Sequence, residues 1–298
     1  MKEQQLTKNW ASSPNRALLD RAAEFLSRKE YRKAHADCMA ALQHDPGEAR
    51  AFYLLGILTA DHTNHAKAID LFDRALTLGP QRADVFAQKA RSEMALLRRD
   101  AAVRSADAAA ALAPEDAFTL DTLGVVYSRA GLHDRSLDFY RRATATEPDI
   151  AAYQYNFGAA LQFAGQIDEA RTAYRRCLEL DPSDTRAQAA IAQITKQTET
   201  DNQIAELEAV FPSVAKNADD ALRIGHALAK AHEDLNHPAE AMAWLAKAKA
   251  AKWAEVKHDA AFDDAIFAAA EKTTALPTAG GHAGARPIFI VGMPRTGT

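Results

Sequence analysis

The sequence predicts a mostly α-helical protein, in which helical hairpins stack into a superhelical solenoid, followed by the first β-strand and phosphate-loop-like turn of an incomplete α/β domain. Three observations support this prediction. Small side chains recur at two fixed positions of a repeating pattern. Near the last residue, the helical pattern gives way to an unbroken apolar run that suits a buried strand. Prolines recur every 34 residues, at Pro46, Pro80, Pro114, Pro148 and Pro182.

The pattern divides the chain into six segments. In order, these are a lead (1–14), five repeats (15–184), atypical and final helical repeats (185–253), a helix (254–275), a linker (276–286) and the truncated start of an α/β domain (287–298). The linker is rich in glycine and alanine, which is typical of a segment between two folded parts.

Each of the five repeats predicts two closely packed antiparallel helices. The eighth residue of a repeat is small: Ala22, Gly56, Ala90, Gly124 and Gly158. The twentieth is also small: Ala34, Ala68, Ala102, Ser136 and Ala170. Three repeats then place an aromatic residue on the second helix: Phe72, Tyr140 and Tyr174. A small residue lets two helix axes approach, and an aromatic ring fills the adjacent groove. The recurring proline ends each second helix, because the residue before a proline disfavours the α conformation.

This pattern resembles the tetratricopeptide repeat, whose hairpins stack into a superhelix. The resemblance implies that the first helices line an inner, concave face, with these residues pointing into it: Leu19, Tyr53, Ile57, Arg91, Met94, Val125, Tyr155 and Gln162. Such a face suits an extended peptide, a helix or the protein's own catalytic domain. The alternative is that several of these residues pack between adjacent repeats. The lysine and asparagine set with which some repeat proteins hold a C-terminal carboxylate is missing.

Residues 286–298 carry a different signal. The run at 288–291 is apolar, β-branched and aromatic, as in a strand buried on both faces of a parallel sheet. Gly292, Pro294 and Gly297 then predict a tight turn whose backbone amides are accessible. Such a turn binds anions, and Arg295 would add a full positive charge. We therefore expect a phosphate or sulfate site here.

Two common nucleotide loops do not fit this turn. A Walker A loop needs lysine where Thr298 stands, and a dinucleotide fingerprint needs glycine where Pro294 stands. The stretch instead resembles the 5′-phosphosulfate loop of sulfotransferases, with an arginine and a threonine at positions 295 and 296 where many members have lysine and serine. The resemblance implies that 3′-phosphoadenosine 5′-phosphosulfate is the cosubstrate, bound by Arg295, Thr296, Gly297 and Thr298. Arg295 would also be catalytic, stabilising charge on the departing phosphate.

A second stretch supports the same family. Residues 226–235 and 239–244 resemble the last repeat of bacterial tetratricopeptide-repeat sulfotransferases. The resemblance implies transfer of a sulfuryl group to a hydroxyl or amine. Because a doubly wound sheet needs further strands after its first turn, we expect residues 1–298 to be part of a longer protein and to be inactive alone. The alternatives are a non-catalytic interaction scaffold and, less favoured, a nucleotide phosphotransferase.

Charge, apolar runs and the placement of cysteine and histidine bear on other kinds of partner and site. The net charge is −4 over 298 residues, which disfavours a nucleic-acid partner. No export signal and no run of about 18 apolar residues is present, so we expect no membrane association and a cytoplasmic location. Cys38 and Cys177 fall at buried repeat positions and are expected to fill the core. His62 and His65 lie in a predicted turn without a third ligand, so no metal site is expected.

Overall fold

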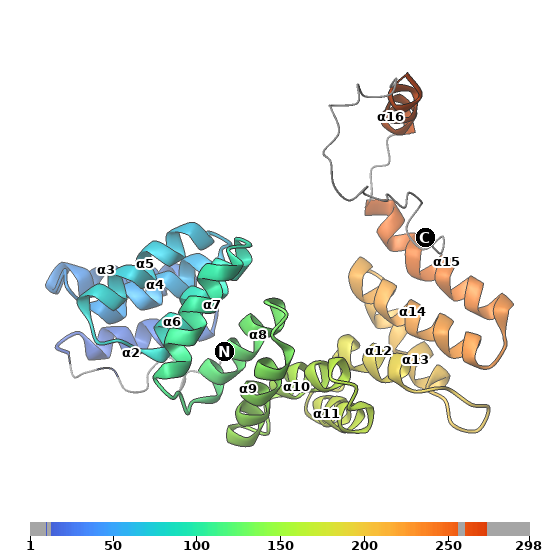
Figure 1. The fold of residues 1–298 in the computed structure, drawn as a ribbon, viewed down its shortest axis with the longest axis horizontal. Helices are drawn as coiled ribbons and strands as arrows, with labels where there is room; N and C mark the ends of the chain where they lie inside the picture. Colours follow the sequence, from blue (N-terminus) through green and yellow to red (C-terminus); the bar gives the residue numbers. More distant parts are fainter. Residues whose placement is uncertain (1–9, 11–12, 256–259, 273–298) are drawn as a thin grey trace, which may run out of the picture. The chain divides into compact units, whose positions relative to one another are not determined.

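The computed structural model describes residues 10, 13–255 and 260–272 (Figure 1). These residues form helices and connecting turns, with no β-strand among them. The helices are α2 (Arg16–Ser27), α3 (Tyr31–His44), α4 (Ala49–Asp61), α5 (His65–Leu78), α6 (Ala83–Ala95), α7 (Arg99–Ala111), α8 (Ala117–Arg129), α9 (His133–Thr146), α10 (Ala151–Phe163), α11 (Ile167–Leu180), α12 (Thr185–Ile194), α13 (Ile204–Val214), α14 (Ala218–Asp234), α15 (Pro238–Glu255) and α16 (Ala260–Lys272). The predicted helical solenoid is confirmed, and the predicted strand lies outside the described residues.

The chain forms two compact units, Met1–Lys252 and Trp253–Thr298. In the first unit, consecutive helices pair into hairpins from α2 with α3 to α10 with α11, and neighbouring first helices such as α6 and α8 also touch. The second unit contains α16, whose residues are all exposed. Of the helix predicted at 254–275, residues 254–255 end α15 and 260–272 form α16. No described helix is long and apolar enough to cross a membrane.

Glycine and aromatic residues meet inside three hairpins. A Cβ atom added to the glycine would lie 2.5–2.8 Å from a ring carbon of the second helix. The pairs are Gly56 with Phe72, Gly124 with Tyr140, and Gly158 with Tyr174. In the first and third repeats an alanine replaces the glycine, and the residue at the aromatic position is small. The close packing predicted from the repeat is therefore confirmed, and it depends on matched side-chain sizes.

The turn between the two helices of each repeat has one residue in the left-handed conformation. The fifteenth residue has φ of 59–76° in all five repeats: Lys29, Thr63, Leu97, Gly131 and Gly165. Glycine adopts this conformation without steric cost, whereas other residues are strained there. The turns predicted at Gly131, Gly165 and residues 61–64 are thus confirmed. The second helices of four repeats also end as predicted, with non-helical backbone at Asp45, Gly79, Glu147 and Asp181.

The hairpin pattern changes after α11. Helix α12 packs against α14, and α13 also lies against α14. A small core forms there from Leu207, Ile224 and Leu228. The connection between α12 and α13 is held by the Asp234 carboxylate, which accepts a hydrogen bond of 2.8 Å from the backbone N–H of Gln197. This rearrangement explains the lengthened period of the sequence after Pro182, and it brings α14 against α12, which in turn touches α10.

Candidate functional site

Two adjoining hollows lie along α10, α12 and α14. One has a volume of about 450 Å³ and is lined mainly by α10 and α12; the other, of about 560 Å³, is lined by α12 and α14. They share Ala189, Gln193 and Arg223, so they form one continuous depression. We call it the α10–α14 groove and define it by Tyr155, Ala159, Arg186, Ala189, Gln193 and Arg223.

Small side chains make room in this groove. Ala159 on α10 and Ala189 on α12 are only half-buried, and each projects a single methyl group. Aromatic groups border them: Tyr155 is half-buried, and Phe163 is 69% exposed and stacks on His133 with ring centroids 3.8 Å apart. Alanines beside accessible aromatic rings leave space for apolar side chains of a ligand.

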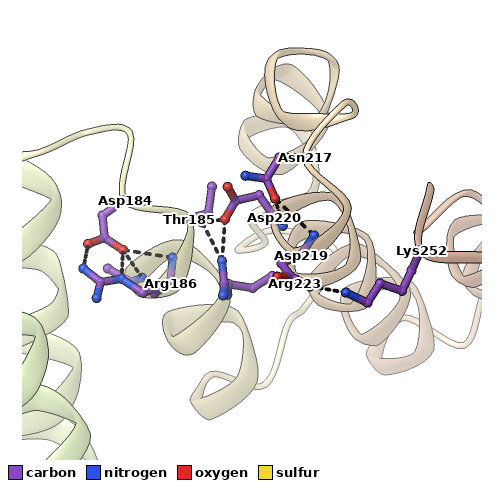
Figure 2. A network of polar contacts seen from close by, with 9 residues as sticks. Asp184, Thr185, Arg186, Asn217, Asp219, Asp220, Arg223 and Lys252 are labelled. Carbon is purple, nitrogen blue, oxygen red and sulfur yellow. Dashed lines mark hydrogen bonds and ion pairs between the residues drawn. The ribbon is translucent and has the colours of Figure 1, made fainter. Parts of the chain in front are cut away.

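Arg186 stands at the start of α12, where Asp184 fixes both the helix and the guanidinium. The Asp184 carboxylate caps α12 by accepting hydrogen bonds from the backbone N–H groups of Arg186 and Ala187. It also accepts two hydrogen bonds from the Arg186 side chain, of 2.5 and 3.1 Å (Figure 2). Burial alone would raise the pKa of Asp184, but these hydrogen bonds hold it below its ordinary value. The Arg186 guanidinium lies 4.3 Å from the Tyr155 ring centroid, a cation–π contact.

A second polar cluster joins α12 to α14. Arg223 donates hydrogen bonds to the Thr185 hydroxyl (3.0 Å) and the Asp220 carboxylate (2.5 Å), and Thr185 donates to Asp220 (2.6 Å) (Figure 2). Asn217 caps α14 beside this cluster. These contacts link the starts of two helices that are far apart in the sequence. They fix the spacing of α12 and α14, two of the three helices that line the groove.

The far end of the groove carries His226 and Lys230. Lys230 donates to the Thr195 carbonyl (2.6 Å) and to the Asp234 carboxylate (2.5 Å), which ties α14 to the end of α12. Burial, and then the charge of Lys249, lower the pKa of His226. His226 is therefore neutral at pH 7 and can both donate and accept a hydrogen bond.

The predicted inner-face residues divide into accessible and buried groups. Tyr155 and Gln162 line the groove, Arg91 is exposed, and Val125 is half-buried. Four others are covered by neighbouring side chains, with exposed fractions of 0–7%: Leu19, Tyr53, Ile57 and Met94. For these four, the structure corrects the prediction. They pack between helices, which is the alternative that the sequence left open.

Arg91 borders a separate hollow of about 470 Å³, beside Asp121 and Phe118. The Asp121 carboxylate accepts a hydrogen bond of 2.9 Å from the Asn156 amide. Burial raises the pKa of Asp121 to about 6, although Asn156 and the charge of Arg91 both oppose this. The pKa of Asp121 is therefore closer to neutral pH than that of an ordinary aspartate.

Cys38 and Cys177 are free thiols in the core, as predicted, and burial raises the pKa of each to about 12. In the part of the chain that the structure describes, no three His, Cys, Asp or Glu residues gather to hold a metal ion. His62 makes an edge-to-face contact with Tyr31, with ring centroids 4.5 Å apart. The predicted cosubstrate residues Arg295, Thr296, Gly297 and Thr298 lie outside the described residues.

Sequence reasoning did not find the residues of α12 and α14. The 34-residue period fails after Pro182, so positions could not be carried over from the earlier repeats. A signal was nevertheless present. Counted from Thr185, the second, fifth and ninth residues are Arg186, Ala189 and Gln193, all of which line the groove. The spacing that the repeat pattern assigns to an inner face in the earlier repeats therefore coincides with groove-lining positions on α12.

Comparisons of sequence identify the repeats. Residues 19–83 and residues 151–194 each match a family model described as tetratricopeptide repeat. The BBSome complex member BBS4 from Mus musculus is 27% identical over 159 residues, which are 53% of this chain and 30% of that protein. The chain thus spans less than a third of this relative. With the hairpins described above, these matches show that the chain contains a tetratricopeptide-repeat array.

Solved structures share the fold at low sequence identity. The Cut9 and Hcn1 hetero-tetramer of APC/C aligns with a TM-score of 0.55 and 18% identity, over 83% of this chain and 45% of that one. PilF of Pseudomonas aeruginosa aligns with a TM-score of 0.53 and 15% identity, over 81% of this chain and 98% of that one. TTC0263, a thermophilic TPR protein of Thermus thermophilus, aligns with a TM-score of 0.51 and 19% identity, over 60% of this chain and 98% of that one. These likenesses concern the fold alone.

Proposed function

We propose that the protein is an interaction scaffold that binds an extended segment of a partner protein in the α10–α14 groove. The observation that carries this proposal is a groove on three helices, lined by alanines together with Tyr155, Phe163 and guanidinium groups held by hydrogen bonds. Tetratricopeptide-repeat arrays present such surfaces for binding. The Cut9 structure was solved with a partner chain, Hcn1, which supports a similar use here.

The chemistry of the groove suits a peptide backbone. An extended peptide exposes carbonyl oxygens that need donors, and its side chains alternate in direction. Gln162 lines the groove, and its carbonyl oxygen already accepts the Tyr174 hydroxyl at 2.8 Å, so its amide N–H groups are the donors that it can offer a ligand. Arg186 and Arg223 hold further N–H groups in fixed positions. We also infer a cytoplasmic location, since both described cysteines are free thiols.

Filling the groove should abolish partner binding. Ala159 lines the groove and is half-buried, so Ala159→Phe places a ring in the space that a ligand would occupy. Peptides selected from a displayed random library on the full chain are the probes. We expect their affinity to fall at least about tenfold on Ala159→Phe, which corresponds to about 1.4 kcal/mol. The measurement is fluorescence anisotropy with the selected peptides.

The matched control is Ala145→Phe. Ala145 lies on α9, a second helix, and is exposed outside the groove. It adds the same ring without entering the groove, so peptide affinity should not change. Equal affinity for the wild-type chain and Ala159→Phe would assign the selected peptides to another surface and refute the proposal.

A second proposal concerns residues 286–298. We propose that they form the 5′-phosphosulfate loop of a sulfotransferase, in which Arg295, Thr296, Gly297 and Thr298 bind 3′-phosphoadenosine 5′-phosphosulfate. The support is the sequence motif: an apolar run, glycines, hydroxyls and one arginine in the order that the loop requires. The array would then present an acceptor protein, or would bind the catalytic domain itself.

Calorimetric titration of the cosubstrate tests this second proposal. The protein should be used with any sequence that follows Thr298 in its natural form, because the remainder of an α/β sheet would contribute to the site. We expect binding that Arg295→Ala weakens about tenfold or more, through loss of a charge-assisted contact. Absence of binding by the natural protein, or equal binding by the variant, would leave the scaffold proposal standing alone.

A further inference from the structure

The chain's own Trp10 packs against the second repeat. The Trp10 ring lies 5.4 Å from the Tyr53 ring on α4, and the Arg82 guanidinium lies 4.3 Å from the Trp10 ring centroid, ahead of α6. Trp10 also packs against the apolar core of the first two repeats. This contact helps explain why Tyr53, which the repeat pattern placed on the accessible inner face, is fully buried.

The chain just after Trp10 is anchored to the first hairpin. The Ser13 hydroxyl donates a hydrogen bond to the Glu48 carboxylate. The Asn15 amide donates to the Ala41 carbonyl at 3.2 Å, and α2 begins at the next residue. Trp10 therefore sits three residues before a fixed point. It is a tethered side chain that docks on a surface formed by other repeats.

Two polar groups buried at the contact between Trp10 and Tyr53 make no hydrogen bond with the described residues. The Trp10 indole N–H and the Tyr53 hydroxyl are both buried, and neither has a hydrogen-bond partner among the described residues. Burial, followed by the charge of Asp84, raises the pKa of Tyr53 well above its ordinary value, so the hydroxyl keeps its proton. Buried polar groups without partners weaken a contact. Trp10 is thus held by a tilted ring contact with Tyr53 and by the cation–π contact with Arg82, and a ligand that also satisfies the Tyr53 hydroxyl would bind this surface more tightly.

We propose that the surface formed by Tyr53 and Arg82 is a second interaction site, which recognises an aromatic side chain of a partner peptide and which Trp10 occupies as a self-ligand. The preferred partner has an aromatic residue three positions before a serine, the arrangement that Trp10 and Ser13 display. Because Trp10 is tethered, its effective concentration at the site is on the order of millimolar. A partner peptide must displace it, so Trp10 reduces binding at this site.

A peptide with the sequence of residues 6–16, carrying a fluorescent label, tests this proposal. Its affinity is measured by anisotropy for the full wild-type chain and for full-length Trp10→Ala. We expect the variant to bind at least about tenfold more tightly, because the self-ligand is gone. The same peptide with alanine in place of tryptophan should bind neither chain. Equal affinity for the two chains, or equal binding of the two peptides, would overturn the assignment.

A second measurement uses the intact lead, so it does not depend on the folding of Trp10→Ala. In a chain with Trp244→Phe and Trp253→Phe, Trp10 is labelled as fluorotryptophan and followed by fluorine NMR. Adding unlabelled tryptophan peptide should move its signal to the position of a solvent-exposed indole. A signal that does not move at saturating peptide refutes displacement.

Ala159→Phe separates this site from the α10–α14 groove. Ala159 lies on α10, whereas Tyr53 is on α4, so this substitution should leave the affinity of the tryptophan peptide for the Trp10→Ala chain unchanged. A loss of affinity would assign the peptide to the α10–α14 groove and overturn the assignment to Tyr53. Failure of the groove proposal would not affect the comparison of wild type with Trp10→Ala.

Discussion

Replacing Gly124 with alanine should lower the free energy of unfolding by about 2 kcal/mol, because the added methyl group overpacks the fourth hairpin. Its Cβ would lie 2.6 Å from a ring carbon of Tyr140, closer than non-bonded carbon atoms approach. Tyr140 is 5% exposed, so its ring has little room to move. Urea unfolding of the full chain, followed by circular dichroism, measures the effect.

The Tyr140→Ala background provides the control. Without the ring, alanine should be better than glycine at position 124 by up to about 1 kcal/mol, because glycine is unfavourable inside a helix. The sign of the Gly124→Ala effect should therefore reverse between the two backgrounds. A destabilisation of equal size in both would show that the ring is not the cause.

The pairing of a small residue with an aromatic ring, on which this prediction rests, could be inferred from the sequence. A fixed period places small and aromatic residues at corresponding positions, and two helices that cross closely need such a combination. The first and third repeats carry Ala22 with Cys38 and Ala90 with Ala106 at the positions that hold glycine and an aromatic residue in the others. The sequence thus contains both halves of the size match, and the structure brings them together within each hairpin.

Which residues of the first helices are exposed was harder to predict from the sequence than which residues lie on those helices. Periodicity places Tyr53, Ile57 and Met94 on first helices, but a first helix also touches the helices of neighbouring repeats. Burial on one helix is therefore decided by residues of other repeats, which the period of that helix does not encode. For Tyr53 the covering group is Trp10, a residue outside the repeats altogether. Such a contact leaves no periodic signal.

The α10–α14 groove was likewise only partly predictable from the sequence, because several helices contribute to it. Its guanidinium groups are fixed by partners at both short and long separations: Arg186 by Asp184 two residues earlier, and Arg223 by Thr185 far along the chain. Local capping of α12 by Asp184 can be read from sequence, because aspartate is favoured at helix starts. The pairing of α12 with α14 cannot, because it results from the insertion of α13 between them.

Asp121→Asn should stabilise the array by about 2 kcal/mol near neutral pH and have little effect near pH 4. Burial raises the pKa of Asp121 from 3.8 to about 6 in the folded chain. Well below the ordinary value of 3.8, the carboxyl group is protonated whether the chain is folded or not. As the pH rises from about 4 through about 6, the unfolded chain releases this proton before the folded chain does, so stability falls. Asparagine is neutral at every pH, and its carbonyl can still accept the Asn156 hydrogen bond.

Urea unfolding of both chains at several pH values between about 4 and 8 measures this difference. Asp138→Asn, an exposed change on α9 of the same repeat, is the control and should alter stability by less than about 0.5 kcal/mol throughout. Arg91 provides a further check, because its charge opposes the shift: Arg91→Gln should extend the fall in stability to higher pH. A wild-type stability that rises between about pH 4 and 6, with no gain from Asp121→Asn, would mean that Asp121 ionises freely. Water in the hollow beside Arg91 would then hydrate the ionised Asp121 carboxylate.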